Sequence, residues 1–510
     1  MSIKVLKKTI SVCPECFKAG KIKKIDAQII EEEGKVWMRK ECSIHGVFKS
    51  IYFSSPELYR KWMKYQADGR GVENVEIKSL PDPSFLYPKH FSQTVLVNLM
   101  VTNRCNLRCS YCFMNAGAAG YIYEPSLEML KKMMQAVRLE KPVPCKALQL
   151  TGGEPTIRND LIEIIKMAKN MGFVHIQLNT NGIRLSEEPE YCQKIKKAGV
   201  NTIYMSFDGV SKQTNPWIEE NKRAIENLRK ADIGVVLVPT VIADSNLQEA
   251  GKIVKYAIEN IDVVRGVNFQ PISFCGRAGF VPNEVRERKR VDYVKLFEVL
   301  EDFFDGQITR DDFYPVPFVY PISKLVEKLR GEPQVEFTAH PGCGGATYIF
   351  IQNGRLIPIT RFINVEKLRQ FIKEQSEKTG PFFKARVTAS FIKNISQFIE
   401  QDKTPKGLEI KKILISAITR GQYKSLGKFH HQALFIGSMW FQDVWNLNLE
   451  RLKRCVIHYS TPEGIVPFCA YNGLGYGDEI RKRHSVSVKE WEEKTGRKVK
   501  DDLWKNGPIS

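Results

Sequence analysis

The sequence predicts an α/β protein whose main domain is an open, partial (β/α)6 barrel. Six apolar, β-rich runs alternate with helical periodicity between residues 94 and 285. A cysteine-containing module precedes them in residues 1–75, and the alternation stops in residues 286–510, where we expect a mostly helical lobe. Six repeats fall short of the eight that close a barrel, so we expect the sheet to stay open.

The N-terminal module contains four potential metal ligands, Cys13, Cys16, Cys42 and His45. Their C-x2-C-x25-C-x2-H spacing is typical of a tetrahedral site for Zn2+ or a mononuclear iron. The spacing does not separate a zinc-ribbon-like structural site from a rubredoxin-like iron that transfers electrons, and both readings stay open. His45 is the least secure ligand, because a distant cysteine would also complete the set.

A linker is expected at residues 76–93, where Pro81, Pro83 and Pro88 prevent a helix or a central strand from running through. The barrel follows at residues 94–285. Alternating strands and helices produce a parallel sheet, with functional side chains on the loops that follow the strands. The expected strands are Val95–Thr102, Ala147–Thr151, Val174–Thr180, Thr202–Phe207, Gly234–Ile242 and Gly266–Gln270.

The C-terminal lobe, residues 286–510, shows helical periodicity without regular strands between the helices. An apolar run at Ala433–Trp440 is also expected to be helical. The other helices are expected at Ile322–Leu329, Val365–Glu374, Thr388–Gln401 and Glu409–Ile418.

Composition excludes several classes of protein. Lys+Arg 77 against Asp+Glu 57 gives a net charge of +20, but a hydrophobic content of 43% excludes a disordered polycation. The 12 cysteines are too dilute for a disulfide scaffold, and Met1–Ile10 lacks the apolar core of a signal peptide, so we expect a cytoplasmic protein.

No run approaches the roughly 18 apolar residues of a membrane-spanning helix. The charge favours anionic partners without choosing among nucleic acid, phospholipid and phosphorylated small molecules.

The segment directly after the first barrel strand contains Cys105, Cys109 and Cys112 in a C-x3-C-x2-C spacing. Such a loop can wrap three thiolates onto three corners of a cubane 4Fe–4S cluster and leave the fourth iron open. A zinc site or three unrelated core cysteines are the alternatives. A triad on a loop at a strand end, in a chain with so few cysteines, favours the cluster.

Further motifs follow the next strands in order. TGGEP comes after the second strand, LNTNG after the third and SFDG after the fourth. Each alone would fit an ordinary turn, but together with the triad they resemble the radical S-adenosylmethionine (SAM) superfamily over about residues 94–271. The residues expected to bind the cofactor are Tyr111, Gly152, Gly153, Glu154, Asn181, Ser206, Asp208 and Gln270.

The resemblance implies a chemistry as well as a fold. The catalytic thiolates of Cys105, Cys109 and Cys112 would hold the cluster, and its open iron would bind the amino and carboxylate groups of SAM. One electron would then release methionine and a 5′-deoxyadenosyl radical, which abstracts hydrogen from an unactivated carbon. The electron would come from an unidentified low-potential donor.

Four further cysteines lie after the barrel strands, at Cys275, Cys343, Cys455 and Cys469. Glycines flank Cys343 and would allow a bulky cluster to approach the backbone closely. We therefore expect at least one auxiliary 4Fe–4S cluster, because four thiolates suffice to ligate one. Four scattered core cysteines are the alternative. The roles of Cys145 and Cys192 stay open.

Over the whole chain, the motifs CPEC, CSIHG, NRCNLRCSYCF, SFCGRAG, HPGCGGATY and PFCAYN resemble the archaeal tetraether lipid synthase family. That resemblance implies an oxidoreductase-like coupling of terminal methyl carbons on the phytanyl chains of two archaeol-type phospholipids. It also implies archaeal phospholipid substrates and peripheral contact with an anionic membrane.

Two other functions compete with lipid coupling. One is a radical SAM methyltransferase acting on a pterin-type cofactor, which needs the same triad but another acceptor. The other is a basic, zinc-containing RNA-binding or RNA-modifying protein. Arg286–Arg290 is the only tight basic run near a barrel edge, and no aromatic residues interleave it as base stacking requires. No nucleic-acid partner is therefore expected.

Overall fold

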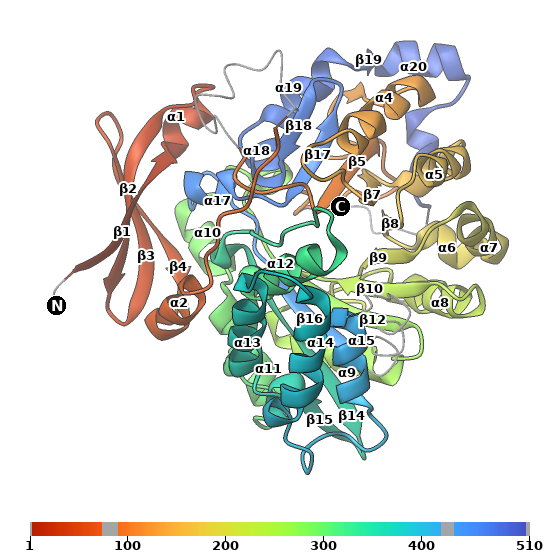
Figure 1. Ribbon diagram of the computed structural model, residues 1–510. Helices are drawn as coiled ribbons and strands as arrows, with labels where there is room; N and C mark the ends of the chain where they lie inside the picture. The colour runs from red at the N-terminus through yellow and green to blue at the C-terminus, as the bar shows by residue number, and fades with distance from the viewer. Residues whose placement is uncertain (1–2, 74–89, 420–432, 506–510) are drawn as a thin grey trace.

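The computed structural model describes residues 3–73, 90–419 and 433–505 (Figure 1). The N-terminal module is a four-stranded antiparallel sheet in the order β1-β2-β3-β4, drawn in red. Most of the expected linker, residues 76–89, lies outside the described residues. The elements of the module are β1 (Lys4–Val12), α1 (Pro14–Lys18), β2 (Lys24–Glu32), β3 (Lys35–Cys42), β4 (Gly46–Phe53) and α2 (Pro56–Met63).

Six parallel strands in chain order form the centre of the main sheet, which confirms the predicted α/β partial barrel. They are β5 (Leu96–Thr102), β7 (Ala147–Gly152), β8 (His175–Thr180), β9 (Thr202–Ser206), β10 (Gly234–Val238) and β12 (Val264–Pro271). Amphipathic helices cover the outer side of these strands (Figure 1). They are α4 (Leu127–Arg138), α5 (Leu161–Asn170), α6 (Ile183–Glu187), α7 (Pro189–Ala198), α8 (Ile218–Lys230) and α9 (Ala250–Glu259).

The C-terminal region extends this sheet at both edges. β16 (Ala433–Met439) pairs parallel with β12, and β17 (Ile457–Thr461) pairs parallel with β5. The prediction of a helix at residues 433–440 is therefore wrong. A short run that is apolar throughout does not distinguish a buried helix from a buried strand, and this one is a strand because β12 and β14 (Gly344–Gln352) supply hydrogen-bonding partners on both sides.

The remaining strands are short. β13 (Tyr314–Pro315) and β15 (Arg355–Pro358) both pair with β14, and β18 (Gly464–Pro467) pairs with β17. β11 (Thr240–Val241) lies beside β12, and β6 (Tyr121–Ile122) pairs with β19 (Val486–Ser487). None of the described helices is long and apolar enough to cross a membrane.

Helices fill the rest of the C-terminal region, and α12 to α15 occupy the four positions expected for helices, with shifted ends. They pack around a small apolar core of their own. The helices of this region are α10 (Asn283–Lys289), α11 (Tyr293–Phe303), α12 (Tyr320–Arg330), α13 (Val365–Glu377), α14 (Phe383–Asn394), α15 (Ile410–Thr419), α17 (Leu449–Lys453), α18 (Phe468–Gly473), α19 (Tyr476–Arg483) and α20 (Val488–Thr495).

The N-terminal module packs tightly on the rest of the chain. Trp62 of α2 is fully buried and contacts the ring of Tyr293 in α11 at 5.3 Å between centroids. Lys40 of β3 is buried too, and its ammonium donates to Val12 O at 3.0 Å and to Val444 O across the interface. Burial lowers the pKa of Lys40 to about 7. The folding of the module and its attachment to the C-terminal region are therefore linked.

Candidate active site and metal centre

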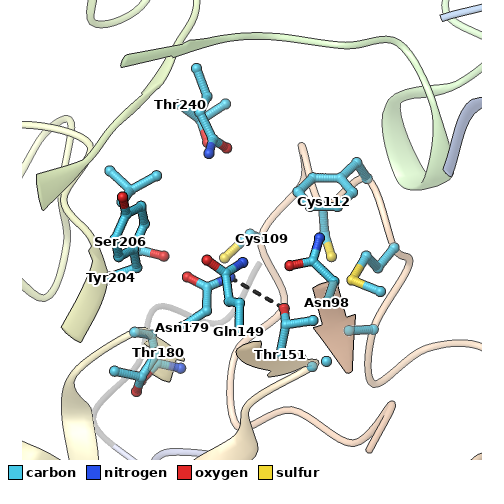
Figure 2. Close-up of a pocket in the computed structure, with 18 of the residues that line it drawn as sticks. Asn98, Cys109, Cys112, Gln149, Thr151, Asn179, Thr180, Tyr204, Ser206 and Thr240 are labelled. Atoms are coloured by element: carbon cyan, nitrogen blue, oxygen red, sulfur yellow. Dashed lines mark hydrogen bonds between the residues drawn. The ribbon is translucent and has the colours of Figure 1, made fainter. Parts of the chain in front are cut away.

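The three cysteines of the triad lie on the loop between β5 and β6, residues 103–120, which we call the triad loop. They line one cavity of about 210 Å3, and Cys109 and Cys112 are labelled in Figure 2. Burial raises the pKa of the Cys105 thiol well above its ordinary value and that of Cys109 to about 12. Only a cationic partner such as an iron cluster would keep buried thiolates ionised, because a bound metal reverses the effect of burial. The donor set and its placement fit a three-thiolate cluster.

The close approach of β7 to the triad loop requires two glycines. A Cβ atom on Gly152 would lie 2.1 Å from Thr102 O, and one on Gly153 would lie 2.0 Å from Arg104 O. Without side chains, the backbones bond directly, from Gly153 N to Thr102 O at 2.8 Å. The glycines thus hold the end of β7 against the start of the triad loop.

Glu154 is buried at the same edge, and burial raises the pKa of its carboxyl group. Its Oε1 accepts from both the backbone and hydroxyl of Thr156 and from the Thr180 hydroxyl, while Oε2 accepts from Asn181 N at 2.8 Å. The side-chain amide of Asn181 in turn donates from Nδ2 to Asn106 Oδ1 of the triad loop at 2.7 Å. The carboxylate therefore joins β7 to β8 and retains acceptor capacity on Oε2 for a cationic group in the cavity.

Tyr111 and Asp208 form a pair behind the triad. The Tyr111 hydroxyl donates to Asp208 Oδ2, and Thr240 N donates to Oδ1 at 2.7 Å. Burial raises the pKa of Asp208 to about 6. Tyr111 lines the cavity, as do Ser206 and Gln270, whereas Asp208 is absent from the lining. Asp208 therefore orients Tyr111 without reaching the cavity itself.

Arg277 is a residue that the sequence analysis missed. It follows Cys275 on the loop after β12, and its guanidinium donates to Cys109 O at 2.6 Å, to Ala116 O at 2.8 Å and to the Asn115 side chain at 3.3 Å. Its backbone N–H also donates to Cys112 O at 3.0 Å. Arg277 therefore forms hydrogen bonds with four residues of the triad loop.

Replacing Arg277 by Met should loosen the triad loop. We expect a slower yield of 5′-deoxyadenosine, by about tenfold or more, since a loss of 1.4 kcal/mol in positioning is tenfold in rate. An altered electron paramagnetic resonance spectrum of the reduced protein would show that the loop itself changed. The matched control is Arg265→Met, because Arg265 lies at the opposite end of β12 and donates to Ile261 O and Asp262 O, away from the triad loop. Equal activity in the two variants would contradict this role of Arg277.

The four cysteines expected for an auxiliary cluster converge only in part. Cys343 and Cys469 both raise the pKa of the Cys455 thiol, and Cys343 also raises that of Cys469. Cys275 interacts electrostatically with Cys469 and with Cys112 of the triad. Arg451 is buried among them and donates to Trp440 O at 2.7 Å. Cys145 and Cys192 are buried separately, and neither lines the cavity.

The N-terminal ligands come together as the spacing predicts. The ligand atoms of Cys13, Cys16, Cys42 and His45 all lie within 4.8 Å of one another. The three sulfurs lie 3.4, 3.5 and 3.7 Å from His45 Nδ1. A tetrahedral zinc ion with ordinary bond lengths places sulfur and nitrogen ligands about 3.5 Å apart, so this set fits a single metal ion.

Comparison with known proteins adds to this geometry. The family model for the radical SAM superfamily matches residues 99–257, and that for the HMPTM N-terminal zinc ribbon domain matches residues 5–54. The 7,8-dihydro-6-hydroxymethylpterin dimethyltransferase of Methanocaldococcus jannaschii is 43% identical over 502 residues, which cover 95% of this chain and 97% of that protein. The chain belongs to the family of this dimethyltransferase, within the radical SAM superfamily. The expected 4Fe–4S cluster, SAM and N-terminal metal site are thereby confirmed.

More distant relatives match a smaller part of the chain. A probable GTP 3′,8-cyclase of Saccharolobus solfataricus is 27% identical over 255 residues, covering 48% of this chain and 77% of that protein. Among solved structures, the radical SAM coproporphyrinogen III oxidase of Escherichia coli covers 66% of this chain and 91% of its own, at 12% identity and a TM-score of 0.32.

The full-length relative contradicts the expected lipid coupling, because it is named for methyl transfer to a pterin. The archaeal phospholipid substrates and the contact with an anionic membrane are contradicted with it. The physical reason lies in the motifs that carried the lipid interpretation. They are short cysteine motifs, which bind metals and clusters and carry little information about the substrate.

Proposed function

We propose that this protein is a radical SAM methyltransferase that acts on 7,8-dihydro-6-hydroxymethylpterin. The observation that carries the proposal is the 43% identity to the Methanocaldococcus jannaschii dimethyltransferase over nearly the full length of both chains. The match therefore includes the zinc ribbon and the C-terminal region as well as the barrel, and the barrel and the C-terminal region both line the cavity.

The cluster, when bound, supplies the electron that cleaves SAM. The thiolates of Cys105, Cys109 and Cys112 would hold it, and the glycine pair and Arg277 fix the loop that carries them. Phe441 and Phe468, whose rings stack at 3.8 Å, line the cavity from the C-terminal region and would exclude water from the radical. The side chains that we propose to orient SAM are Tyr111, Glu154, Asn181, Ser206 and Gln270, with the backbone of Gly152 and Gly153 and with Asp208 acting through Tyr111.

Product analysis tests the proposal directly. The reconstituted, reduced protein is incubated without oxygen with SAM and 7,8-dihydro-6-hydroxymethylpterin, and the products are read by mass spectrometry. With reductant in excess, we expect 5′-deoxyadenosine and methionine together with pterin that carries one or two added methyl groups. Each methyl group comes from a further SAM molecule, which leaves as S-adenosylhomocysteine. Cleavage of SAM with the pterin left unmodified would overturn the proposed function.

We also propose that Cys343, Cys455 and Cys469, with Cys275 as a candidate fourth ligand, hold an auxiliary 4Fe–4S cluster. The thiols interact electrostatically. Hydrogen bonds also hold two of these cysteines beside one short segment, from Trp440 N to Cys343 O at 3.1 Å and from Gln442 N to Cys469 Sγ at 3.3 Å. Cys469→Ala should lower the iron content by about four atoms per chain and abolish pterin methylation, while SAM cleavage persists. Unchanged iron content would contradict the auxiliary cluster, and Cys145→Ala is the matched control.

A further inference from the structure

The inner wall of the barrel carries amide side chains that the cofactor residues do not account for. Asn98 of β5, Gln149 of β7, Asn179 of β8 and Asn268 of β12 all line the cavity of the triad. Asn98 and Gln149 are register neighbours on adjacent strands. Figure 2 shows Asn98, Gln149 and Asn179 around the same cavity as Cys109 and Cys112. We call these four residues the amide belt.

The amide belt is not explained by the stability of the fold. Asn98 is 1% exposed, and its Oδ1 atom is buried without a hydrogen-bond partner among the residues that the structure describes. A buried polar atom without a partner is destabilising, so such an atom at a cavity wall is evidence for a ligand that bonds to it. Asn179 Nδ2 donates only a long bond of 3.3 Å to Thr151 Oγ1, which leaves its carbonyl oxygen for the cavity.

Asn98, Gln149 and Asn268 lie deeper in the barrel than the proposed cofactor contacts, whereas Asn179 directly precedes the end of β8. Asn98 precedes the strand end at Thr102 by four residues, which is about 13 Å along a strand. Asn268 precedes Gln270, the residue expected to contact SAM, by two residues on the same strand. A molecule bound to the belt would therefore lie beneath SAM, where the radical forms above it.

Apolar side chains line other parts of the same cavity. They are Met439 at the end of β16, which pairs with β12, Ile457 of β17, which pairs with β5, and the stacked rings of Phe441 and Phe468. The cavity thus offers amide donors and acceptors together with flat apolar surfaces. This combination suits a flat heterocycle with donors and acceptors in the plane of its ring, because amides bond to the edge while aromatic groups cover the face. An alkyl chain would leave the amides unpaired.

We propose that the amide belt is the substrate-recognition site and binds the amino- and oxo-substituted edge of a pterin ring. This inference rests on the proposed function for the identity of the heterocycle. Asn98 and Gln149 together present two carbonyl oxygens and two NH2 groups, which match a ring edge with alternating N–H groups and acceptors. Asn179 and Asn268 approach the same molecule from the neighbouring strands.

Calorimetric binding to the anaerobic, cluster-containing protein tests the belt, with 7,8-dihydro-6-hydroxymethylpterin and SAM as separate probes. Asn98→Leu should weaken pterin binding about tenfold or more and leave SAM binding unchanged, because the lost hydrogen bonds reach only the substrate. Its melting temperature should not fall, since Leu removes a buried atom without a partner. Gln149→Leu should act in the same direction. Gln193→Leu, at an exposed position on α7, is the matched control.

The outcomes separate the inference from the proposed function. Normal pterin binding in both Asn98→Leu and Gln149→Leu would overturn the amide belt and leave the methyltransferase standing. An equal loss of SAM affinity would also overturn the inference, because the belt would then belong to the cofactor. Wild-type protein that neither binds nor methylates the pterin would overturn the proposed function itself, and the assignment of the belt to a pterin with it.

Discussion

Replacing Cys105, Cys109 and Cys112 together by Ala should abolish the formation of 5′-deoxyadenosine and methionine. The three thiols line one cavity and are the ligands that the triad loop offers to the radical cluster. Their removal should lower the iron content by about four atoms per chain, because one 4Fe–4S cluster is lost. Iron and sulfide determination, together with chromatography of the nucleoside products, measures both effects.

Cys192→Ala is the matched control for the triad. Cys192 is fully buried in α7, and its thiol donates to Leu185 O rather than facing the cavity. The control should keep its iron content and its SAM cleavage. If the triple variant still cleaves SAM, the assignment of the triad fails. A triple variant that loses iron but not its secondary structure would show that the cluster is needed for chemistry rather than for folding of the barrel.

The centre of the fold was predictable from the sequence because its signals are local. Each β-rich run precedes a helical run, and the chemistry-bearing residues follow the strand ends, where a parallel sheet gathers them. The triad and the GGE motif line one cavity in the structure, and Gly153 N donates to Thr102 O at the end of β5. The spacing of the N-terminal ligands was equally informative, since two short loops suffice to bring them together.

The edges of the sheet were not predictable in this way. β16 and β17 pair with barrel strands more than 150 residues away in the sequence, and nothing local distinguishes the apolar β16 from a buried helix. Arg277 was missed because its partners are backbone carbonyls, which no motif identifies. The amide belt did leave a signal, because Asn98 and Gln149 interrupt otherwise apolar strands at inward positions.

The amino-acid composition could not identify the substrate. A net charge of +20 suits any anionic partner, and the aromatic residues of the C-terminal region suit a core as well as a lipid site. In the structure, many of those residues pack in the core, such as Phe313 against Phe297 at 3.8 Å between ring centroids. The amide belt that lines the cavity, rather than the net charge of the whole chain, indicates the class of substrate.

Removal of the N-terminal metal should unfold the ribbon and loosen its contact with the C-terminal region. Cys42→Ala takes one of four ligands from a site whose sulfurs lie 3.4–3.7 Å from His45 Nδ1. In isolated zinc fingers the metal contributes about 10–16 kcal/mol of apparent folding free energy, so a module of this size should not keep its sheet without it. The buried Lys40 and Trp62 depend on that sheet, so we expect a lower melting temperature and proteolysis confined to residues 3–63.

Elemental analysis and limited proteolysis measure the two effects. Ser43→Ala is the matched control, because Ser43 lies between Cys42 and His45 and its hydroxyl accepts a hydrogen bond from Lys23. The zinc ribbon match favours zinc, whereas one iron beyond the clusters with visible absorbance in the ribbon would establish a rubredoxin-like site. A Cys42→Ala protein that keeps its metal and its melting temperature would refute the ligand assignment. Loss of the metal with SAM cleavage intact would show that the ribbon acts on structure and not on electron supply to the triad.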